Sequence, residues 1–465
     1  MPPLILLTRL LNLLEMTIKS GDILYFIGLG GIGMSALARW CKHLGAVVYG
    51  YDAQPTNLTD ELIEEGMLLH FEENTSMIPE NVDYVIYTPA IPKNNIELKY
   101  FRNRKTPIFK RSEFLSLITE QFRTIAIAGT HGKTSITALT AHMLKSAGLN
   151  VSAFVGGICR NYNSNLILSE NSNYLLVEAD EYDRSLLKLN PLIAVISSTD
   201  EDHLDIYNDH NDIKSTFFEF GQRIKENGTL IHNLSVGPFD KLSCEKMSYA
   251  VNSDTNATAT NIKIKNGKYH IDIKVEGLLI PEVRIQVPGI HNIMNTLAAS
   301  SIGYLTGLSG DDIKSGIESF KGVERRMDYR VESSDIIYID DYAHHPEEIK
   351  YTIKTIKELY PGKKITGVFQ PHLYSRTNDF AKEFANELSK LDEVLLLPIY
   401  PAREQPIKGV SSSLIKNKMS NKNCTVSKRN EVIQFLKANK PEILITMGAG
   451  DIGTMVQEIE TLFLN

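Results

Sequence analysis

The sequence predicts an α/β protein of three domains, and three observations lead to this fold class. Apolar stretches that suit buried parallel strands alternate with helical stretches along most of the chain. Several of these stretches end in a glycine-rich turn or in acidic residues, as the strands of nucleotide-binding sheets do. The 465 residues, 43% of them hydrophobic, suffice for two or three domain cores. We expect an N-terminal extension at 1–16 and domains at 17–111, 112–324 and 325–465.

Residues 1–16 are the one candidate for a targeting segment. Their apolar run is interrupted by Arg9, Asn12 and Glu15, has no small-residue cleavage site and is too short to span a bilayer. We interpret it as an extension, with Met16 as an alternative start, and predict no membrane insertion.

Charge and cysteine usage narrow the function class. The formal net charge of -7 argues against a nucleic-acid-binding protein. The four cysteines lie far apart with no C-x-x-C pair, which indicates neither a disulfide framework nor a zinc site. A cytoplasmic location fits this usage.

The first domain opens with a strand, a glycine turn, a helix, a second strand and an acid over residues 23–52. Gly28, Gly30 and Gly33 form a G-x-G-x-x-G pattern that includes Gly31, and Asp52 ends the second strand. This is a Rossmann-like βαβ unit, which binds NAD or another nucleotide diphosphate. Further strands are expected at 84–91 and 107–111. His70 between them is expected to be a surface or packing histidine.

The second domain carries a strand that leads into a phosphate-binding turn, TIAIAGTHGKT at 124–134. The turn matches the end of a P-loop, although Ile127 replaces the first glycine of that pattern. Backbone N–H groups and the N-terminus of the helix expected at 135–146 would bind phosphate oxygens. Lys133 would reach the terminal phosphates and Thr134 would ligate Mg²⁺. The pattern predicts a P-loop domain that binds a nucleoside triphosphate.

Acidic clusters follow two further strands of this domain, at 178–183 and 200–205. Carboxylates at the carboxyl edge of a parallel sheet beside a P-loop are suitable Mg²⁺ ligands, and Glu178 is the preferred one. His203, from the pattern alone, would be structural. Residues 252–287 alternate like a β-hairpin that turns at Asn266-Gly267. The following GIHN segment starts a helix, either as a plain cap or as a functional group.

The third domain is expected to be a second Rossmann-like α/β unit, after a join at 320–330. Its alternation of strands and helices implies a parallel sheet covered by helices. Polar clusters at 340–345 and 370–376 follow its first two strands, at the edge where open α/β sheets bind ligands. Adjacent His344 and His345 do not suit a metal pair.

Taken together, these motifs resemble the Mur ligase family. They are GLGGIG, GTHGKT, EADEYD, the DHLD loop, GIHN, RRM, DDYAHHP and FQPHLYSRT, and they cover nearly everything after Met16. The resemblance implies ATP-dependent ligation of L-alanine to the carboxylate of UDP-N-acetylmuramate through an acyl phosphate. It implies a monomer or homodimer that works in peptidoglycan precursor synthesis.

The resemblance also implies roles for individual residues. UDP-substrate contacts are expected from Gly28, Gly30, Gly31, Gly33, Asp52, Thr88, Ala90 and Ile91. ATP contacts are expected from Gly129, Thr130, Gly132, Lys133, Thr134, Ser135, His291, Asn292, Asn295, Arg326 and Asp341. Thr134, Glu178 and His203 are expected to bind Mg²⁺, or Mn²⁺ in its place. L-alanine contacts are expected from Tyr342, His344, His372 and Arg376. The catalytic group is expected to comprise Lys133, His131, Glu178, His203, His344, His372 and Arg376.

Two positions depart from the family pattern. Leu373 stands where the family often has arginine, so Arg376 is expected to supply the carboxylate contact. Arg403 stands where the family has glycine. Several related ligases use a carbamylated lysine, and the resemblance leaves open whether Lys214, which matches it by position, has this role.

Three alternatives remain open. A nicotinamide-dependent dehydrogenase would leave the P-loop unused, and a P-loop kinase or ATPase would leave the first domain unused. The nearest alternative is the recycling ligase that joins an intact tripeptide to the same muramate.

Overall fold

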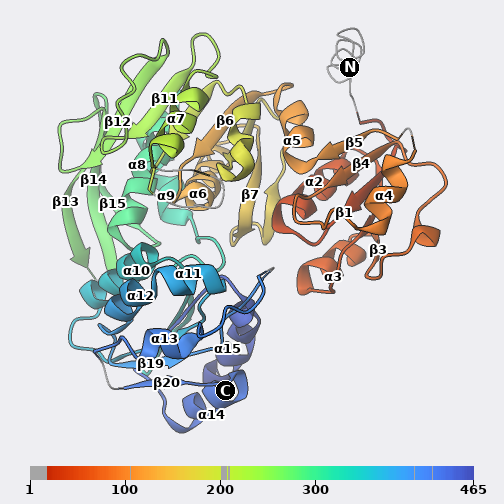
Figure 1. Ribbon diagram of the computed structural model, residues 1–465. Helices are drawn as coiled ribbons and strands as arrows, with labels where there is room; N and C mark the ends of the chain where they lie inside the picture. The colour runs from red at the N-terminus through yellow and green to blue at the C-terminus, as the bar shows by residue number, and fades with distance from the viewer. Residues whose placement is uncertain are drawn as a thin grey trace. The chain divides into compact units, whose positions relative to one another are not determined.

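The computed structural model describes residues 18–104, 106–200, 207, 210–265, 267–402, 404–420 and 423–464. These residues form three sheets, of five, ten and six strands (Figure 1). The chain divides into two compact units. The first comprises Met1–Thr258, Lys274–Leu279 and Asn295–Gly316, and the second comprises Ala259–Ile273, Ile280–Met294 and Ile317–Asn465. The three-domain α/β class expected from the sequence is confirmed.

The first sheet is parallel with the strand order β3-β2-β1-β4-β5. Its strands are β1 (Ile23–Ile27), β2 (Val47–Tyr51), β3 (Leu68–His70), β4 (Tyr84–Tyr87) and β5 (Ile108–Lys110). Its helices are α2 (Ile32–His43), α3 (Asn57–Glu64), η1 (Thr75–Met77), α4 (Ile96–Arg102) and α5 (Arg111–Thr119). Side chains of β1 alternate between a core that includes α2 and a core that includes α4. Helices therefore cover both faces of the sheet. The turn after β1 lies at the carboxyl edge of the sheet.

The second sheet has the order β15-β14-β13-β12-β11-β10-β6-β9-β7-β8. Its strands are β6 (Arg123–Ala128), β7 (Val151–Cys159), β8 (Ser164–Ile167), β9 (Tyr174–Ala179), β10 (Ile193–Ile196), β11 (Thr229–Asn233), β12 (Glu245–Val251), β13 (Ala257–Lys265), β14 (Lys268–Val275) and β15 (Leu278–Ile285). The helices are α6 (Lys133–Ser146), η2 (Tyr182–Lys188), α7 (His210–Gly221), α8 (Ile290–Leu305) and α9 (Gly310–Ser319). The expected strand at 124–128 is β6, and it lies between β9 and β10.

The expected hairpin corresponds to β13 and β14, which are neighbours in the second sheet. Gly267 has a φ of +68°, a left-handed conformation that glycine adopts readily in tight turns. Asn266, the other residue of the predicted turn, lies outside the described residues.

The third sheet has the order β16-β17-β21-β18-β19-β20. Its strands are β16 (Asp328–Glu332), β17 (Ile337–Asp341), β18 (Ile365–Phe369), β19 (Glu393–Leu396), β20 (Cys424–Val426) and β21 (Ile443–Met447). The helices are α10 (Pro346–Leu359), α11 (Tyr374–Asp379), α12 (Ala381–Leu388), α13 (Ser412–Lys416), α14 (Arg429–Ala438), η3 (Asp451–Met455) and α15 (Val456–Leu464). One core includes side chains of α10 and α12 and another includes those of α14 and α15, so helices pack on both faces.

One strand of the third sheet was not expected. The sequence predicts a join at 320–330, yet Asp328–Glu332 form β16, which pairs antiparallel with β17. The remaining paired strands of this sheet run parallel, as predicted. Within the described part of the chain, none of the helices is long and apolar enough to cross a membrane.

Candidate active site

The P-loop turn lies between β6 and α6, and its conformation depends on two glycines. Gly129 has a φ of +133° and Gly132 a φ of +85°. A Cβ on Gly129 would stand 2.1 Å from Ser197 Oγ, so no larger residue fits without a shift of the segment that ends β10. The turn therefore brings its backbone close to the end of β10 and opens onto the N-terminus of α6, where backbone N–H groups attract anions.

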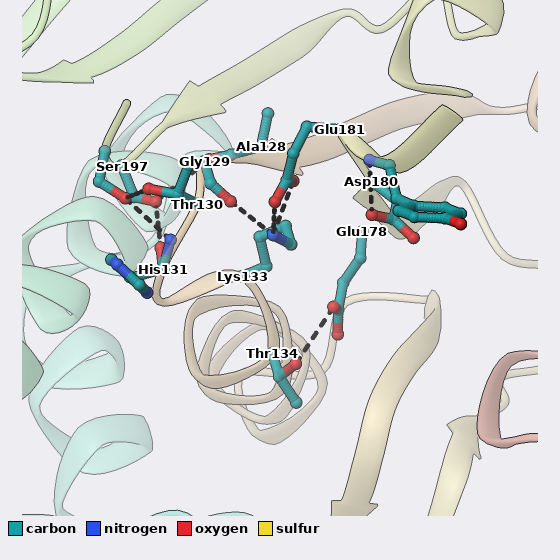
Figure 2. Close-up of polar contacts among 12 residues, drawn as sticks. Ala128, Gly129, Thr130, His131, Lys133, Thr134, Glu178, Asp180, Glu181 and Ser197 are labelled. Carbon is teal, nitrogen blue, oxygen red and sulfur yellow. Dashed lines mark hydrogen bonds and ion pairs between the residues drawn. The ribbon is translucent and has the colours of Figure 1, made fainter. Parts of the chain in front are cut away.

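Lys133 is the first residue of α6, and its ammonium lies inside the turn (Figure 2). Its Nζ donates to the Gly129 carbonyl at 2.6 Å and to both carboxylate oxygens of Glu181, at 2.9 and 2.7 Å. Burial desolvates the ammonium and lowers its pKa, but Glu181, Asp180 and Glu178 outweigh this effect and hold the pKa of Lys133 above its usual value. Lys133 is therefore a fixed positive charge beside the phosphate-binding turn.

The side chains of Thr134 and Glu178 meet on the side of Lys133 that faces away from Glu181 (Figure 2). The Thr134 hydroxyl donates to Glu178 Oε2 at 3.1 Å, and the Gly156 N–H donates to Glu178 Oε1 at 2.5 Å. A Cβ on Gly156 would stand 2.7 Å from both carboxylate oxygens, so a glycine on β7 makes room for this carboxylate. A hydroxyl and one carboxylate, with phosphate oxygens and water, make a donor set that fits Mg²⁺.

The other expected metal ligand, His203, lies outside the described residues. Among the residues that the structure describes, no group of three or more His, Cys, Asp or Glu side chains is arranged to hold a metal ion.

Two serines that directly follow β10 hold the P-loop in place. Ser198 Oγ accepts from the His131 N–H at 2.8 Å and hydrogen-bonds Thr130 Oγ1 at 2.9 Å. Ser197 Oγ donates to the His131 carbonyl at 2.5 Å. The His131 ring lies 3.7 Å from Asp200 Oδ2. These contacts fix the turn from the strand beside it, and no local feature of the sequence indicated them.

The expected adenine-binding residues occupy the start of α8. Asn295 lies at the P-loop, because a Cβ on Gly132 would be 2.6 Å from Asn295 Oδ1. In the second unit, the Asn292 amide donates to the Pro288 carbonyl at 2.7 Å and lies 3.0 Å from His291 Nε2. Asn292 therefore joins the first turn of α8 to Pro288 and contacts His291. This bond is not an N-cap, in which the side chain accepts from a helical N–H, so the choice between a cap and a functional group stays open.

The glycine turn of the first domain brings together most of the residues predicted to bind the UDP moiety. The Gly30 N–H donates to Asp52 Oδ2 at 2.8 Å, so the acid at the end of β2 faces the turn. A Cβ on Gly28 would stand 2.4 Å from Thr88 Cγ2 and 3.3 Å from Ile91 Cδ1. The Ala90 N–H donates to Thr88 Oγ1 at 3.3 Å. Gly31 is the N-cap of α2 and Gly33 is in its first turn.

In the third domain, the residues predicted to bind L-alanine cluster at the carboxyl ends of β17 and β18. The ring centroids of Tyr342 and His344 lie 5.2 Å apart, and those of His344 and His372 lie 6.0 Å apart. The His372 ring also stacks on Tyr400 at 5.7 Å. Burial, His344 and Arg376 lower the pKa of His372 to about 4. Both its own burial and the neighbouring Arg376 also lower the pKa of His344, against the effect of Glu348.

The hydrogen bonds of His344 define its tautomer. Its Nδ1 lies 3.0 Å from the Tyr342 carbonyl, which can only accept, so Nδ1 carries the proton and Nε2 is left as an acceptor. Glu348 Oε2 lies 3.2 Å from the same Nδ1. This is an imidazole that a carboxylate orients and that can take a proton at Nε2.

Arg326 and Asp341 lie close to the same cluster. The Arg326 guanidinium stands over the Tyr342 ring, with Cζ 4.8 Å from the centroid. Asp341 accepts from the Met327 N–H at 2.9 Å and the Ala343 N–H at 2.8 Å. Burial raises the pKa of Asp341 to about 7, although Arg326 and the two N–H groups act to lower it.

Three family models match successive parts of the chain. The catalytic domain of the Mur ligase family matches residues 23–123, the Mur ligase middle domain matches 127–303, and the glutamate ligase domain matches 325–450. The chain belongs to the Mur ligase family.

This Mur ligase is similar over nearly its whole length to curated members of the family. It is 44% identical to UDP-N-acetylmuramate--L-alanine ligase of Flavobacterium johnsoniae, with 96% of this chain and 99% of that protein covered. It is 46% identical to the enzyme of the same name from Flavobacterium psychrophilum, over 94% and 97% of the two chains. The UDP-N-acetylmuramate-alanine ligase structure of Thermotoga maritima matches with a TM-score of 0.82 at 26% identity, over 95% of this chain and 99% of that one.

Two polar contacts of this Mur ligase were not predicted from the sequence, Lys133 with Glu181 and His70 with Glu97. Glu181 was one of several acids after β9, and nothing in its spacing distinguished it as the partner of Lys133. His70, expected to be a surface or packing residue, is partly buried and lies 2.8 Å from the buried carboxylate of Glu97, which also accepts from the Tyr25 hydroxyl at 2.8 Å. These partners are 27 to 72 residues apart in sequence, so no local pattern reveals them.

Proposed function

We propose that the chain ligates L-alanine to the carboxylate of UDP-N-acetylmuramate and converts ATP to ADP and phosphate. The observation that carries this proposal is the group formed by Lys133, Thr134 and Glu178 in a chain 44% identical, over nearly its full length, to a ligase of this name. The product is UDP-N-acetylmuramoyl-L-alanine, so the enzyme acts in peptidoglycan precursor synthesis.

The first half-reaction activates the carboxylate, which is a poor electrophile. One of its oxygens attacks the γ-phosphorus of ATP, the bond to the β,γ-bridging oxygen breaks, and ADP leaves an acyl phosphate. Lys133 neutralises charge on the transferring group, while the backbone N–H groups of the P-loop orient the phosphates. Thr134 and Glu178 would hold Mg²⁺, or Mn²⁺, with His203 as a further ligand, and the bound ion would add positive charge at the phosphates. His131 contacts the muramate carboxylate.

The second half-reaction forms the amide bond. The amine of L-alanine attacks the acyl carbon, the C–O bond to phosphate breaks, and phosphate leaves with the electron pair. The amine must first lose a proton, and His344 Nε2 is the proposed acceptor, because the Tyr342 carbonyl and Glu348 lie at Nδ1 and leave the Nε2 lone pair available. The pKa of His372 is lowered to about 4, so its ring is neutral near pH 7. Its neutral ring instead borders the site, and Arg376 binds the L-alanine carboxylate.

The remaining assignments follow from the family. The first-domain glycine turn binds the uridine diphosphate, with Asp52 and Thr88 beside it. His291, Asn292 and Asn295 contact the adenine, and Arg326 and Asp341 contact ATP. We retain the domain limits 17–111, 112–324 and 325–465, a monomer or homodimer, a cytoplasmic location and no nucleic-acid partner.

The test is ADP release with Mg-ATP and UDP-N-acetylmuramate, together with the mass of the product. L-alanine, glycine, L-serine and the tripeptide L-Ala-γ-D-Glu-diaminopimelate are compared as amines. Turnover with L-alanine and a mass gain of one alanine residue are expected. Turnover with the tripeptide alone would instead indicate the recycling ligase, and no turnover with any amine would remove the ligase assignment.

The recycling ligase is the second candidate because its fold is the same. The murein peptide ligase of Psychrobacter arcticus matches with a TM-score of 0.69 at 21% identity, which concerns the fold alone. The 44% and 46% identity to enzymes named UDP-N-acetylmuramate--L-alanine ligase favours L-alanine as the amine.

A further inference from the structure

The segment that enters the third domain contains two adjacent arginines, and both guanidiniums lie near the Tyr342 ring, with Cζ 5.2 Å (Arg325) and 4.8 Å (Arg326) from its centroid. Arg326 is predicted to contact ATP, and within the described residues its guanidinium makes no hydrogen bond or ion pair; it only stands over the Tyr342 ring. Arg325, in contrast, also binds the Asp340 carboxylate and the Gly448 carbonyl. This difference suggests that one arginine serves the ligand and that the other holds the segment in place.

Arg325 binds the carboxyl ends of two strands with separate nitrogens. Its Nε lies 3.1 Å from Asp340 Oδ2 on β17, and its Nη2 donates to the Gly448 carbonyl just after β21, at 2.5 Å. The Asp340 side chain is 0% exposed, and its other oxygen accepts from the Thr446 hydroxyl at 2.5 Å. A buried carboxylate with a charge-assisted partner fixes the geometry strongly, because either group alone would be costly to bury.

Hydrogen bonds join the backbone around Arg325 to the predicted ligand-binding residues. The Tyr342 N–H donates to the Arg325 carbonyl at 2.6 Å, and the Met327 N–H donates to Asp341 Oδ2 at 2.9 Å. Arg325 has a φ of +62° and Met327 a φ of +46°, left-handed conformations that are strained for residues other than glycine. The side-chain anchor and these hydrogen bonds together maintain the strained segment.

The space around the guanidinium is fitted to it as well. A Cβ on Gly453 of η3 would stand 2.6 Å from Arg325 Nη1 and 2.8 Å from its Cζ. The glycine therefore allows the guanidinium to lie between η3 and the ends of β17 and β21.

We propose that Arg325 is a positioning residue for ATP: through Asp340 and Gly448 it sets the place of Arg326, Asp341 and Tyr342. This rests on the proposed function, in which Arg326 and Asp341 contact ATP. Two of the nitrogens of Arg325 are bound to Asp340 and to Gly448, so its effect on ATP is transmitted through the segment that they hold.

The test compares Arg325→Lys and Gly453→Ala with the control Glu460→Gln. Lysine keeps the charge but cannot bind Asp340 and Gly448 at once, and the methyl group that Gly453→Ala adds displaces the guanidinium while Arg325 and Asp340 remain. The control removes a carboxylate of α15 that binds the Arg330 side chain of β16, not the Arg325 guanidinium. Initial rates give KM for each substrate and kcat, and thermal unfolding reports stability.

Both test variants are expected to raise KM for ATP roughly tenfold, because an effect of this size corresponds to the loss of one charge-assisted contact. KM for UDP-N-acetylmuramate should stay unchanged. Glu460→Gln is expected to lower the melting temperature without a change in KM for ATP. An unchanged KM for ATP in both folded test variants would overturn the inference, and so would an equal rise in the control. Arg326→Met tests the ATP contact of Arg326 separately from the positioning role of Arg325. If Arg326→Met leaves KM for ATP unchanged, the proposed ATP contact is wrong. If Arg326→Met raises KM for ATP and the two test variants do not, only the role of Arg325 is wrong.

Discussion

Among single residues, the Lys133–Glu181 pair carries the sharpest prediction. We expect Lys133→Met to lower kcat about 10²- to 10³-fold, because a preorganised charge on the transferring phosphoryl group is lost. The same change should destabilise the fold by roughly 3–5 kcal/mol, since Glu181, only 2% exposed, loses its cation.

The double variant Lys133→Met/Glu181→Gln separates these two effects. It should regain much of the stability, measured by thermal unfolding, and none of the activity. Near-normal kcat in either variant would contradict the assignment of Lys133.

A second residue, His372, gives the protein a pH-dependent stability. Its folded pKa of about 4 lies below the value of about 6.5 expected in the unfolded chain, so the unfolded chain binds the proton more readily. Stability should therefore fall as the pH decreases from about 6.5 to about 4, by on the order of 2–3 kcal/mol, with no further contribution below that window.

Denaturant unfolding of the wild type, His372→Gln and the exposed-site control His43→Gln between pH 7 and 4 measures this effect. The free energy of unfolding should decline less steeply with falling pH in His372→Gln than in the wild type. In His43→Gln it should decline as in the wild type. Parallel profiles for wild type and His372→Gln would remove His372 as the cause.

At the scale of elements, the turns of the second domain allow a matched comparison of two glycines. Gly129 and Gly148 both have positive φ, +133° and +84°, and flank α6 within the same unit. A Cβ at 148 meets nothing within 4 Å, whereas one at 129 meets Ser197 Oγ at 2.1 Å and the Ser198 N–H nitrogen at 2.9 Å.

Gly148→Ala should therefore cost about 1 kcal/mol of stability, from backbone strain, and keep full activity. Gly129→Ala should abolish ADP release, because the turn cannot stay against the end of β10. Similar activity of the two variants would show that this close approach is not needed.

The elements also show what the sequence could and could not predict. β1, β6, β9 and β17 were predicted because each is a short apolar run followed by a glycine turn or an acid, and this signal is local. β16 was missed because it is an edge strand with three charged residues in five, DYRVE, and its pairing with β17 is not visible in its own composition.

The same limit applies to the candidate site. Lys133, Thr134 and Glu178 were predicted from motifs, and the fold brings them together. Ser197 and Ser198 were not predicted. They follow β10 and form hydrogen bonds with Ala128 and His131, which lie 66 to 69 residues earlier in the sequence, so no local motif includes them.

For the whole molecule, the division into two units separates the predicted ligand contacts. The residues expected to bind the UDP moiety all lie in the first unit, and those expected to bind L-alanine all lie in the second. The predicted ATP contacts are shared, with Lys133 and Thr134 in the first unit and Arg326 and Asp341 in the second. Among the described residues, the core that includes α2 and α7 shares no side chain with the two cores around β21.

We therefore expect calorimetry to resolve two unfolding transitions, one for each unit. UDP-N-acetylmuramate at about 100 times its Kd should stabilise the first unit alone, by about 2.7 kcal/mol, and raise its Tm by a few degrees. Mg-ATP should raise both transitions, because its predicted contacts include residues of each unit. In Lys133→Met the ATP-induced rise should shrink in the first transition and persist in the second. A single transition that every ligand shifts equally would mean that the two cores unfold as one cooperative unit, and an ATP effect confined to the first transition would remove Arg326 and Asp341 from the nucleotide site.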